Sequence, residues 1–494
     1  MTALRLAIVR AVRAAALLLP LAGLAHALVP PAADVDDATH EWLTGEPLLA
    51  RPTDHGVTLR AIAGADLTAW VEWRTGDDDW QTSASVWAAA GTPFDVTVDT
   101  LSADTDYDYR LLLQPANDPV PPSAGPVRRF HTQRRPGAGF RFAVQADPHL
   151  DENSDPDIYR QTLRNMLDAR PDFLVDLGDT AMSDRCIIGI ELLCDRTKAT
   201  TYEQVAARHS LMRAFFGRVG HSVPLFMALG NHEAEAGWAS SGAAGTLAEW
   251  SRRARLLYFA NPEPDGFYTG TDERDDSGVG RQNYYAFEWG DALFVVLDPF
   301  AYTTRKPTQF TDAHMWAWTI GDAQYAWLTE TLARSRARYK FVFSHHMTGG
   351  GSAEVRGAAA HASRFEWGGR NLDGSWGLDR YRPSWDRPIH QLFVDYGVTI
   401  WFHGHDHLYA REDVDGIVYQ SVPQPSTARY QGPDLAAQYG YLATPGQTAF
   451  VTPSYLQVSV EEHGVTVDLI RSVLPEDESA TLKNRAILTS YVVH

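Results

Sequence analysis

The sequence contains few cysteines for its length. Among 494 residues only Cys186 and Cys194 occur, and they bracket the short segment from Ile187 to Leu193. No other cysteine is therefore present to supply a thiolate ligand to a metal site elsewhere in the chain. In an exported protein, an even pair at this spacing indicates a disulfide that pins one loop. Closing so small a loop stabilises a fold by about 2 to 3 kcal/mol in the chain-entropy estimate.

The sequence also lacks a long hydrophobic run. The uncharged stretch from Ala14 to Ala25 has twelve residues and is interrupted by Pro20, whereas a membrane-spanning helix needs about 20 apolar residues. Three arginines precede this stretch and Ala25-His26-Ala27 follows it, a pattern typical of a secretory signal peptide, here residues 1–27, cleaved before Leu28. The alternative is a membrane anchor. We expect a secreted or periplasmic protein with no membrane span after cleavage.

Basic residues are scarce relative to acidic ones. Lys and Arg number 43 against 62 Asp and Glu, which gives a formal charge of −19. Removal of the three arginines in the predicted signal peptide brings the mature chain to about −22. Such a surface repels nucleic acid and acidic lipid. Nucleic acid is therefore excluded as the main partner.

The chain is long and apolar enough to form more than one domain. Its hydrophobic fraction of 44% suits large cores, and 494 residues predict two to four domains. Short β-rich runs separated by Gly, Asp and Pro turns occupy residues 40–133 and predict an all-β sandwich. These runs are Val57–Ile62, Leu67–Arg74, Ser83–Trp87, Phe94–Val98, Tyr107–Leu113 and Val127–Thr132. A linker composition from Gln133 to Gly139 separates them from a second domain that starts at Phe140.

Five polar clusters in the second domain each follow a short apolar run that is predicted to be a buried strand. The runs are Phe140–Ala146, Phe173–Leu177, Leu225–Leu229, Phe341–Phe343 and Val398–Phe402. The clusters that follow them, in the same order, are Asp147-Pro148-His149, Gly178-Asp179, Gly230-Asn231-His232-Glu233, Ser344-His345-His346 and Gly404-His405-Asp406-His407. Helical patterns alternate with these strands, which predicts an α/β domain. In open α/β sheets ligands bind beyond the carboxyl ends of the strands. The five clusters therefore predict one site.

The residue types in these clusters indicate a metal centre. Imidazole, carboxylate and an amide oxygen together suit Zn, Fe or Mn, whereas Ca or Mg favours oxygen ligands alone. Seven candidate ligands exceed the four or so that one metal needs. Two divalent ions that share a bridging carboxylate fit this number. Taken singly, each residue is more often a turn former or a hydrogen-bonded histidine at a strand end.

The order of the clusters resembles that of the calcineurin-like metallophosphoesterase superfamily, over about Phe140 to Arg471. The last two clusters and the preceding domain are most similar to the purple acid phosphatase branch. The resemblance implies an α/β (α+β) layered β-sandwich at 140–471, preceded by an all-β, fibronectin III-like sandwich at 40–133. The segment Leu101–Arg110 resembles a strand-entry signature of fibronectin type III domains. Residues 472–494 are assigned to a C-terminal tail.

The resemblance also implies a role for each site residue. It assigns Asp147, His149 and His407 to the first metal, Asn231, His345 and His405 to the second, and Asp179 to both. His345 is preferred to the adjacent His346 because it stands first after Ser344. His403 is expected to pack or support, and Asp406 to orient a ligand.

His232 is not needed as a ligand, and its family role is general acid; a structural histidine is the alternative. Purple acid phosphatases bear a tyrosine three positions after the bridging aspartate, where this chain has Met182. We therefore expect two divalent metals without a ferric chromophore. Asp184 is a candidate partner for His232 in place of that tyrosine.

The predicted activity is hydrolysis of small phosphate monoesters by a secreted dinuclear-metal phosphoesterase. Bound water reaches a pKa near 7 on such metals, so hydroxide attacks phosphorus while His232 protonates the leaving oxygen. The alternatives are a phosphodiesterase or nucleotidase with the same metals, and a non-catalytic surface-binding protein. Three long insertions, Ser183–Thr200, Glu263–Gln282 and Thr348–Arg387, are expected to rim the site.

The third insertion carries residues that could contact a substrate. Monoester binding requires one or two of its six arginines to point inward, because arginine matches phosphate oxygens. It also holds Trp367, Trp376 and Trp385, which either stack on a substrate or hold the loop down.

Overall fold

The structure is a computed structural model that describes residues 42–494 except 117–120, 152, 185–198, 241–244, 275–277, 428–433 and 442–448. The predicted signal peptide, residues 1–27, and the predicted Cys186–Cys194 disulfide lie outside the described residues. No helix in the described part of the chain is both long and apolar enough to cross a membrane.

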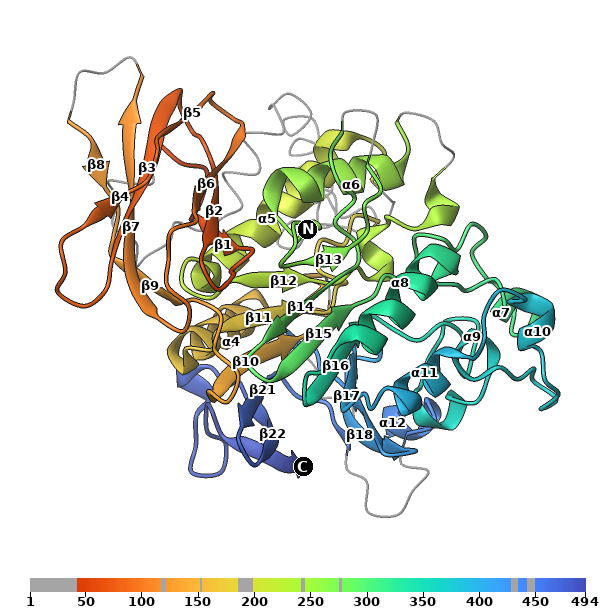
Figure 1. The fold of residues 1–494 in the computed structure, drawn as a ribbon. Coiled ribbons are helices and arrows are strands. Elements are labelled where there is room, and N and C mark those ends of the chain that lie inside the picture. Colours follow the sequence, from red (N-terminus) through yellow and green to blue (C-terminus); the bar gives the residue numbers. More distant parts are fainter. Residues whose placement is uncertain are drawn as a thin grey trace, which may run out of the picture.

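Nine strands form an N-terminal β-region of two sheets (Figure 1). One sheet contains β1 (Leu48–Ala50), β2 (Val57–Ile62) and β6 (Pro93–Val98); the other contains β3 (Leu67–Arg74), β4 (Gln81–Thr82), β5 (Val86–Ala88), β7 (Asp106–Pro115), β8 (Ser123–Ala124) and β9 (Arg128–His131). Alternate residues of β3 are buried, as expected when one face of a strand lies against a core. The inward side chains of both sheets form one hydrophobic cluster.

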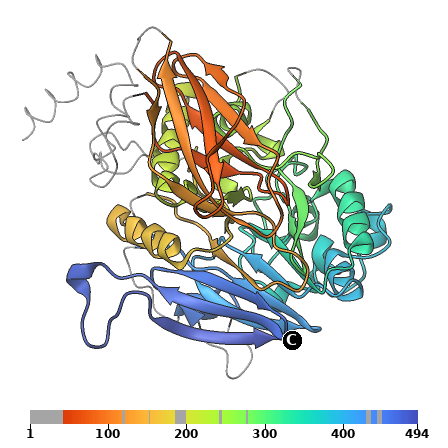
Figure 2. The ribbon, with the colours of Figure 1, turned by 60° about the vertical axis from the view of Figure 1, so that its left-hand side comes forward.

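A six-stranded sheet begins the second half of the fold. Its order is β12 (Leu225–Met227), β11 (Phe173–Asp176), β10 (Phe140–Gln145), β21 (Ser454–Glu461), β22 (Gly464–Arg471) and β23 (Ile487–Val493). The first three strands are parallel and the others pair antiparallel. The chain after 472, predicted to be a tail, thus contributes β23 to the edge of this sheet. Figure 2 shows these C-terminal strands in blue.

An eight-stranded sheet packs against the first. Its order is β13 (Thr269–Gly270), β14 (Tyr285–Trp289), β15 (Ala292–Val296), β16 (Tyr339–Ser344), β17 (Ile400–His403), β19 (Ile417–Ser421), β18 (Tyr409–Val414) and β20 (Ala449–Phe450). Strands β15, β16, β17 and β19 are parallel. Between the two sheets lies a core rich in phenylalanine, in which Phe142 and Phe294 meet edge to face at 5.1 Å.

Helices cover the outer faces of both sheets. On the six-stranded sheet lie α4 (Pro156–Ala169) and α5 (Tyr202–Gly220), with α6 (Leu247–Tyr258) against α5; on the eight-stranded sheet lie α8 (Gly321–Arg334) and α11 (Ile389–Asp395). Short helices α7 (Asp312–Met315), α9 (Phe365–Gly368), α10 (Leu378–Tyr381) and α12 (Asp434–Gln438) complete that side. The predicted mixture of sheets and helices in a layered fold is confirmed. Strands β14 and β15 and helix α6 were not predicted, although Gly290-Asp291 between two apolar runs is a hairpin signal.

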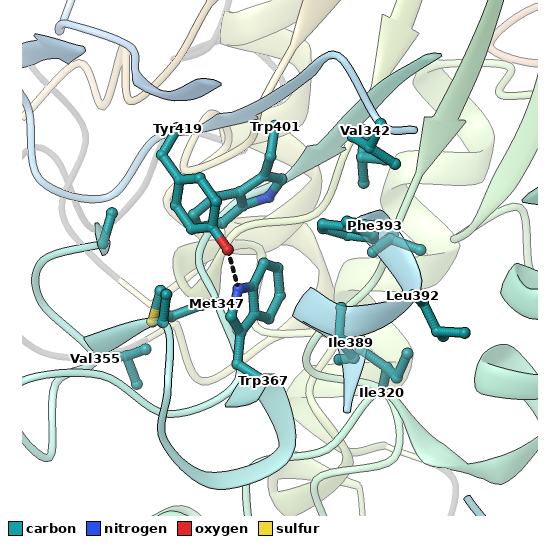
Figure 3. Close-up of a cluster of buried hydrophobic side chains, with 14 of the residues drawn as sticks. Ile320, Val342, Met347, Val355, Trp367, Ile389, Leu392, Phe393, Trp401 and Tyr419 are labelled. Atoms are coloured by element: carbon teal, nitrogen blue, oxygen red, sulfur yellow. Dashed lines mark hydrogen bonds between the residues drawn. The ribbon is translucent and has the colours of Figure 1, made fainter. Parts of the chain in front are cut away.

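Two of the three tryptophans in the third insertion hold that insertion against the rest of the fold. Trp367 is 1% exposed, packs on Trp401 of β17 and donates a hydrogen bond to the Tyr419 hydroxyl at 2.8 Å (Figure 3). Trp385 stacks on Tyr325 at 3.9 Å. By contrast, the Trp376 side chain is 48% exposed. Of the two alternatives for these tryptophans, Trp367 and Trp385 hold the loop down.

The N-terminal β-region is joined to the rest of the fold by buried hydrogen bonds. The Tyr109 hydroxyl donates to the His221 carbonyl at 2.5 Å. Arg213 of α5 donates to the carbonyls of Glu46 and Arg60 at 3.0 and 2.9 Å. Because these groups are buried, breaking the joint would leave donors and acceptors unsatisfied. The joint therefore positions α5, which also packs beside the candidate site.

Candidate metal centre

The polar clusters converge where the strands end. Strands β10, β11 and β12 of one sheet and β16 and β17 of the other each precede a cluster residue by one to four positions. The loops then turn sharply, because several cluster residues adopt left-handed backbone angles that non-glycine residues seldom occupy. These residues and their φ values are Asp147 (57°), His149 (51°), Asp179 (56°), His405 (72°) and His407 (59°). Such concentrated backbone strain is typical of functional sites.

The first group of side chains contains Asp147, His149 and His407. The Oδ1 atom of Asp147 lies 3.6 Å from His149 Nε2 and 3.4 Å from His407 Nε2. The other oxygen, Oδ2, accepts a hydrogen bond from the His405 backbone N–H at 2.8 Å. One carboxylate oxygen is thus held by the backbone, and the other faces two imidazoles.

The second group contains Asp179, His345 and His405. His345 Nε2 lies 3.1 Å from Asp179 Oδ2 and 3.2 Å from His405 Nδ1. All three side chains are buried. Asp179 repeats the arrangement of Asp147, because its Oδ1 accepts from the His232 backbone N–H at 2.7 Å while Oδ2 faces the imidazoles.

Asp179 stands between the two groups. Its Oδ2 lies 3.5 Å from His149 Nε2 in the first group and 3.1 Å from His345 Nε2 in the second. A ligand atom so close to imidazoles of both groups has the position that a bridging carboxylate requires. Asn231 follows β12 at the start of the turn that also carries His232.

The donor set fits metal ions because several buried ligand atoms lack other partners. Within the described residues, Asp147 Oδ1, His149 Nε2 and Asn231 Oδ1 are buried and have no hydrogen-bond partner. Buried polar atoms are rarely left unsatisfied. Metal ions coordinated by these atoms would satisfy all three. A mixed set of nitrogen and oxygen donors suits Zn, Fe or Mn.

The electrostatics of the site favour ionised carboxylates. Burial raises the pKa of Asp179, but the facing His345 and His232 lower it by more. The pKa therefore lies well below its ordinary value. Burial lowers the pKa of His345, whereas Asp179 and Asp147 raise it, to about 9. In the metal-free site a proton on His345 therefore balances part of the negative charge. Metal binding must displace this proton, because imidazole coordinates in its neutral form.

Neighbouring acceptors fix the orientation of three imidazoles. His149 Nδ1 lies 3.2 Å from Asp151 Oδ2, His345 Nδ1 lies 2.9 Å from the Leu177 carbonyl, and His405 Nε2 lies 2.6 Å from the Glu354 carbonyl. Such contacts select the tautomer and aim the opposite nitrogen at a metal. Asp151 was not predicted, although its place two residues after His149 is a signal that could have identified it.

Glu233 clamps two of the loops together, a role that was not predicted. Its buried carboxylate accepts backbone hydrogen bonds from Gly230, Asp179, Thr180 and Ala181 at 2.6 to 3.0 Å. These loops touch so closely that a Cβ on Gly178 would lie 2.3 Å from Gly230 N. The clamp therefore fixes Asp179 relative to the loop that carries Asn231 and His232.

His232 lies at the edge of the site, beside both groups. Its Nε2 is 3.9 Å from Asp179 Oδ2, and its Nδ1 is 2.7 Å from Asp184 Oδ1. Asp184 thus occupies the partner position that was expected for it in place of a tyrosine. Met182 is buried, 2% exposed.

The remaining polar residues of the clusters face elsewhere. His346 packs against Phe300 and Trp318, and His403 stacks on Trp401 at 4.4 Å. Burial lowers the pKa of both histidines, to about 3 in each case, so both remain neutral. Asp406 binds the third insertion rather than a histidine, through the Gly357 N–H at 2.8 Å.

A comparison with protein families decides the identity of this site. Residues 140–409 match the model of the calcineurin-like phosphoesterase family. The chain belongs to the calcineurin-like phosphoesterases. It is accordingly a metal-dependent phosphoesterase, and the matched segment includes all eight residues assigned to the site. A search of curated proteins gave no match.

Solved structures of calcineurin-like phosphoesterases and related folds share this architecture. The purple acid phosphatase PPD1 from yellow lupin (Lupinus luteus) seeds is 14% identical, with a TM-score of 0.60 over 90% of this chain and 73% of that chain. The structure of PhoD is also 14% identical, with a TM-score of 0.64 over 94% and 91% of the two chains. At this identity the likeness concerns the fold alone.

The phosphoesterase should be colourless when purified with its metals. Purple colour requires a tyrosinate bound to ferric iron, and the thioether of Met182 at the corresponding position cannot form that bond. Absorbance between the ultraviolet and near-infrared, measured with metal content on the same sample, checks this. A visible tyrosinate-to-iron band would show that another tyrosine replaces the missing one.

Proposed function

We propose that this protein is a secreted dinuclear-metal phosphoesterase that hydrolyses phosphate monoesters. The observation that carries this proposal is the position of Asp179 Oδ2, 3.5 Å from an imidazole of one group and 3.1 Å from an imidazole of the other. Asp147, His149 and His407 would hold one metal, Asn231, His345 and His405 would hold the other, and Asp179 would serve both. When bound, the two cations supply activation of water and neutralisation of charge on the phosphoryl oxygens.

His232 supplies the proton for the leaving group. Its backbone is fixed by the hydrogen bond to Asp179, and Asp184 accepts from Nδ1, which leaves Nε2 to face the site. A histidine so oriented can donate a proton from Nε2 to the departing oxygen. Asp184 keeps the ring in this orientation.

The completeness of the residue set favours catalysis over a purely structural role. A surface-binding protein with a vestigial site has no need to retain every ligand, the general acid, and the acceptors that orient them. Asp151 and Glu233 are buried acids, and each contacts groups that belong to the site: Asp151 lies beside His149 Nδ1, and Glu233 accepts from the backbone around Asp179. A buried carboxylate costs stability unless it is hydrogen-bonded or paired, and here the partners include the site residues and their loops.

Metal analysis of the purified protein, combined with a hydrolysis screen, tests the proposal. We expect about two divalent ions per chain, as the ligand number implies, and hydrolysis of phosphate esters that stops when a chelator removes them. The control is the chelated protein reloaded with Zn, Mn or Fe. Fewer than one ion per chain after reloading, or full activity without metal, would contradict the dinuclear assignment.

Monoesters should be hydrolysed better than diesters. A monoester carries close to two negative charges near neutral pH, and its binding therefore benefits from cations beyond the metals. The measurement is the turnover of an aryl phosphate against that of the matching bis-aryl diester. A clear preference for the diester would instead favour a phosphodiesterase or nucleotidase with the same metals.

The proposal extends to domain organisation and location. We propose a fibronectin III-like domain at 40–133 and a catalytic domain that starts at 140 and, because β23 joins its sheet, extends beyond the predicted boundary at 471. The two antiparallel sheets of the N-terminal β-region support the first assignment. Secretion is proposed from the signal-peptide pattern of residues 1–27 alone.

A further inference from the structure

Arg356, in the third insertion, contacts the loop that carries two of the proposed metal ligands. Its Nη1 donates to the His405 carbonyl and to Asp406 Oδ1, the latter at 3.2 Å. Asp406 stands between His405 and His407 in the sequence. The guanidinium is therefore fixed directly beside the metal centre rather than on the outer surface of the insertion.

Asp406 is built to hold this arginine in place. It is 2% exposed, and its Oδ2 accepts from the Gly357 N–H at 2.8 Å and from the Tyr441 hydroxyl at 2.7 Å. The Arg356 guanidinium also lies over the Tyr439 ring, 5.3 Å from its centroid. A carboxylate with two neutral donors and one cation fixes the direction of the guanidinium more firmly than a surface ion pair does.

Part of the Arg356 guanidinium remains available to a ligand. All its hydrogen bonds to described residues use Nη1, and the buried Nε lies 3.8 Å from Glu354 Oε2, so Nη2 is the nitrogen left for a ligand. The side chain is 24% exposed. The other arginines of the insertion bind elsewhere: Arg364 contacts His361, Arg370 binds the Gly374 carbonyl, Arg380 lies over Tyr381, Arg382 pairs with Glu366 and Arg387 with Asp395.

We infer that Arg356 binds a non-bridging oxygen of the substrate phosphoryl group and thereby favours monoesters over diesters. This inference rests on the proposed function and names the residue that selects the substrate class. A monoester presents three non-bridging oxygens, of which two metals can neutralise two. The third oxygen needs a further cation, and a guanidinium is suited to it. In a diester that third oxygen carries the second ester group, so the arginine has no charge to neutralise.

Phosphate binding tests the inference independently of turnover. Inorganic phosphate, which has the same free oxygens as a monoester, is titrated calorimetrically into metal-loaded wild type, Arg356→Ala and Arg356→Gln. The glutamine variant keeps a polar N–H group but lacks the charge and the reach of Nη1. Arg370→Ala, from the same insertion, is the matched control, because the Arg370 side chain donates to the Gly374 carbonyl and lies over the Trp376 ring.

We expect both Arg356 variants to bind phosphate about 10- to 100-fold more weakly, the loss typical of one charge-assisted hydrogen bond. Their metal content should equal that of wild type, and Arg370→Ala should bind phosphate normally. Unchanged phosphate affinity in Arg356→Gln would overturn the inference. Metal loss from both Arg356 variants would also overturn it, because the arginine would then act only as a brace for the His405 loop.

The ester comparison separates this inference from the proposed function. For Arg356→Gln we expect KM for an aryl phosphate to rise by a similar factor, while kinetics with the matching methyl aryl diester change less than about threefold. Equal losses on both esters would overturn the selecting role of Arg356. A wild-type protein that hydrolyses neither ester would refute the proposed function, whereas the phosphate titration would still decide whether Arg356 binds an anion.

Discussion

Asp179→Ala is expected to abolish hydrolysis and to lower the metal content. Asp179 is the carboxylate whose Oδ2 lies within 3.5 Å of imidazoles in both groups, so in the proposed dinuclear site its removal would take a ligand from both ions at once. It also removes one of the two carboxylates that face the His345 and His149 rings, the other being Asp147. Metal analysis and turnover, measured on the same dialysed sample, check this prediction.

Asp172→Ala is the matched control for Asp179→Ala. Asp172 is also buried, but it precedes β11, whereas Asp179 follows it, and it binds Arg134 at 2.6 Å. Its loss should lower stability without removing metal. Full metal occupancy and full activity in Asp179→Ala would refute the shared-ligand arrangement.

His232→Ala is expected to retain both metals and to lose turnover, most strongly for esters with poor leaving groups. The side chain lies 3.9 Å from Asp179 and is held by Asp184, and in the proposed arrangement it is not a metal ligand, so metal binding should not depend on it. General acid catalysis raises the rate of turnover by about 10²- to 10⁴-fold. An ester whose leaving group is stable as an anion needs little protonation. The measurement is kcat across a series of aryl and alkyl phosphates of rising leaving-group pKa.

The slope of that series decides between the two roles of His232. A general acid gives a flat dependence in wild type and a steep one in His232→Ala, with near-normal rates for the best leaving groups. A loss of equal size for every ester would show that the histidine is structural. Asp184→Asn, which keeps the shape of the partner but removes its charge, should show the same trend more weakly.

Much of the architecture could be predicted because its signals are local. Strands β2 and β3 match the predicted bounds, since alternating or continuous apolar runs ended by turn residues need no distant information. The ligand clusters were equally visible, because each directly follows such a run. Strand β23 was missed although Ile487–Val493 is largely apolar, because its apolar and polar residues do not alternate.

The sequence by itself determined which residue types gather at the strand ends, and hence a metal centre and its family. The tertiary structure decided how they are used. Only three-dimensional packing brings Asp179 Oδ2 within 3.5 Å of imidazoles in both groups. It also places the Glu233 carboxylate beside four backbone N–H groups. Among the six arginines of the third insertion, it places Arg356 beside the His405 loop. The physical reason is that these contacts join loops far apart in the chain, through strained backbone turns that no local pattern specifies.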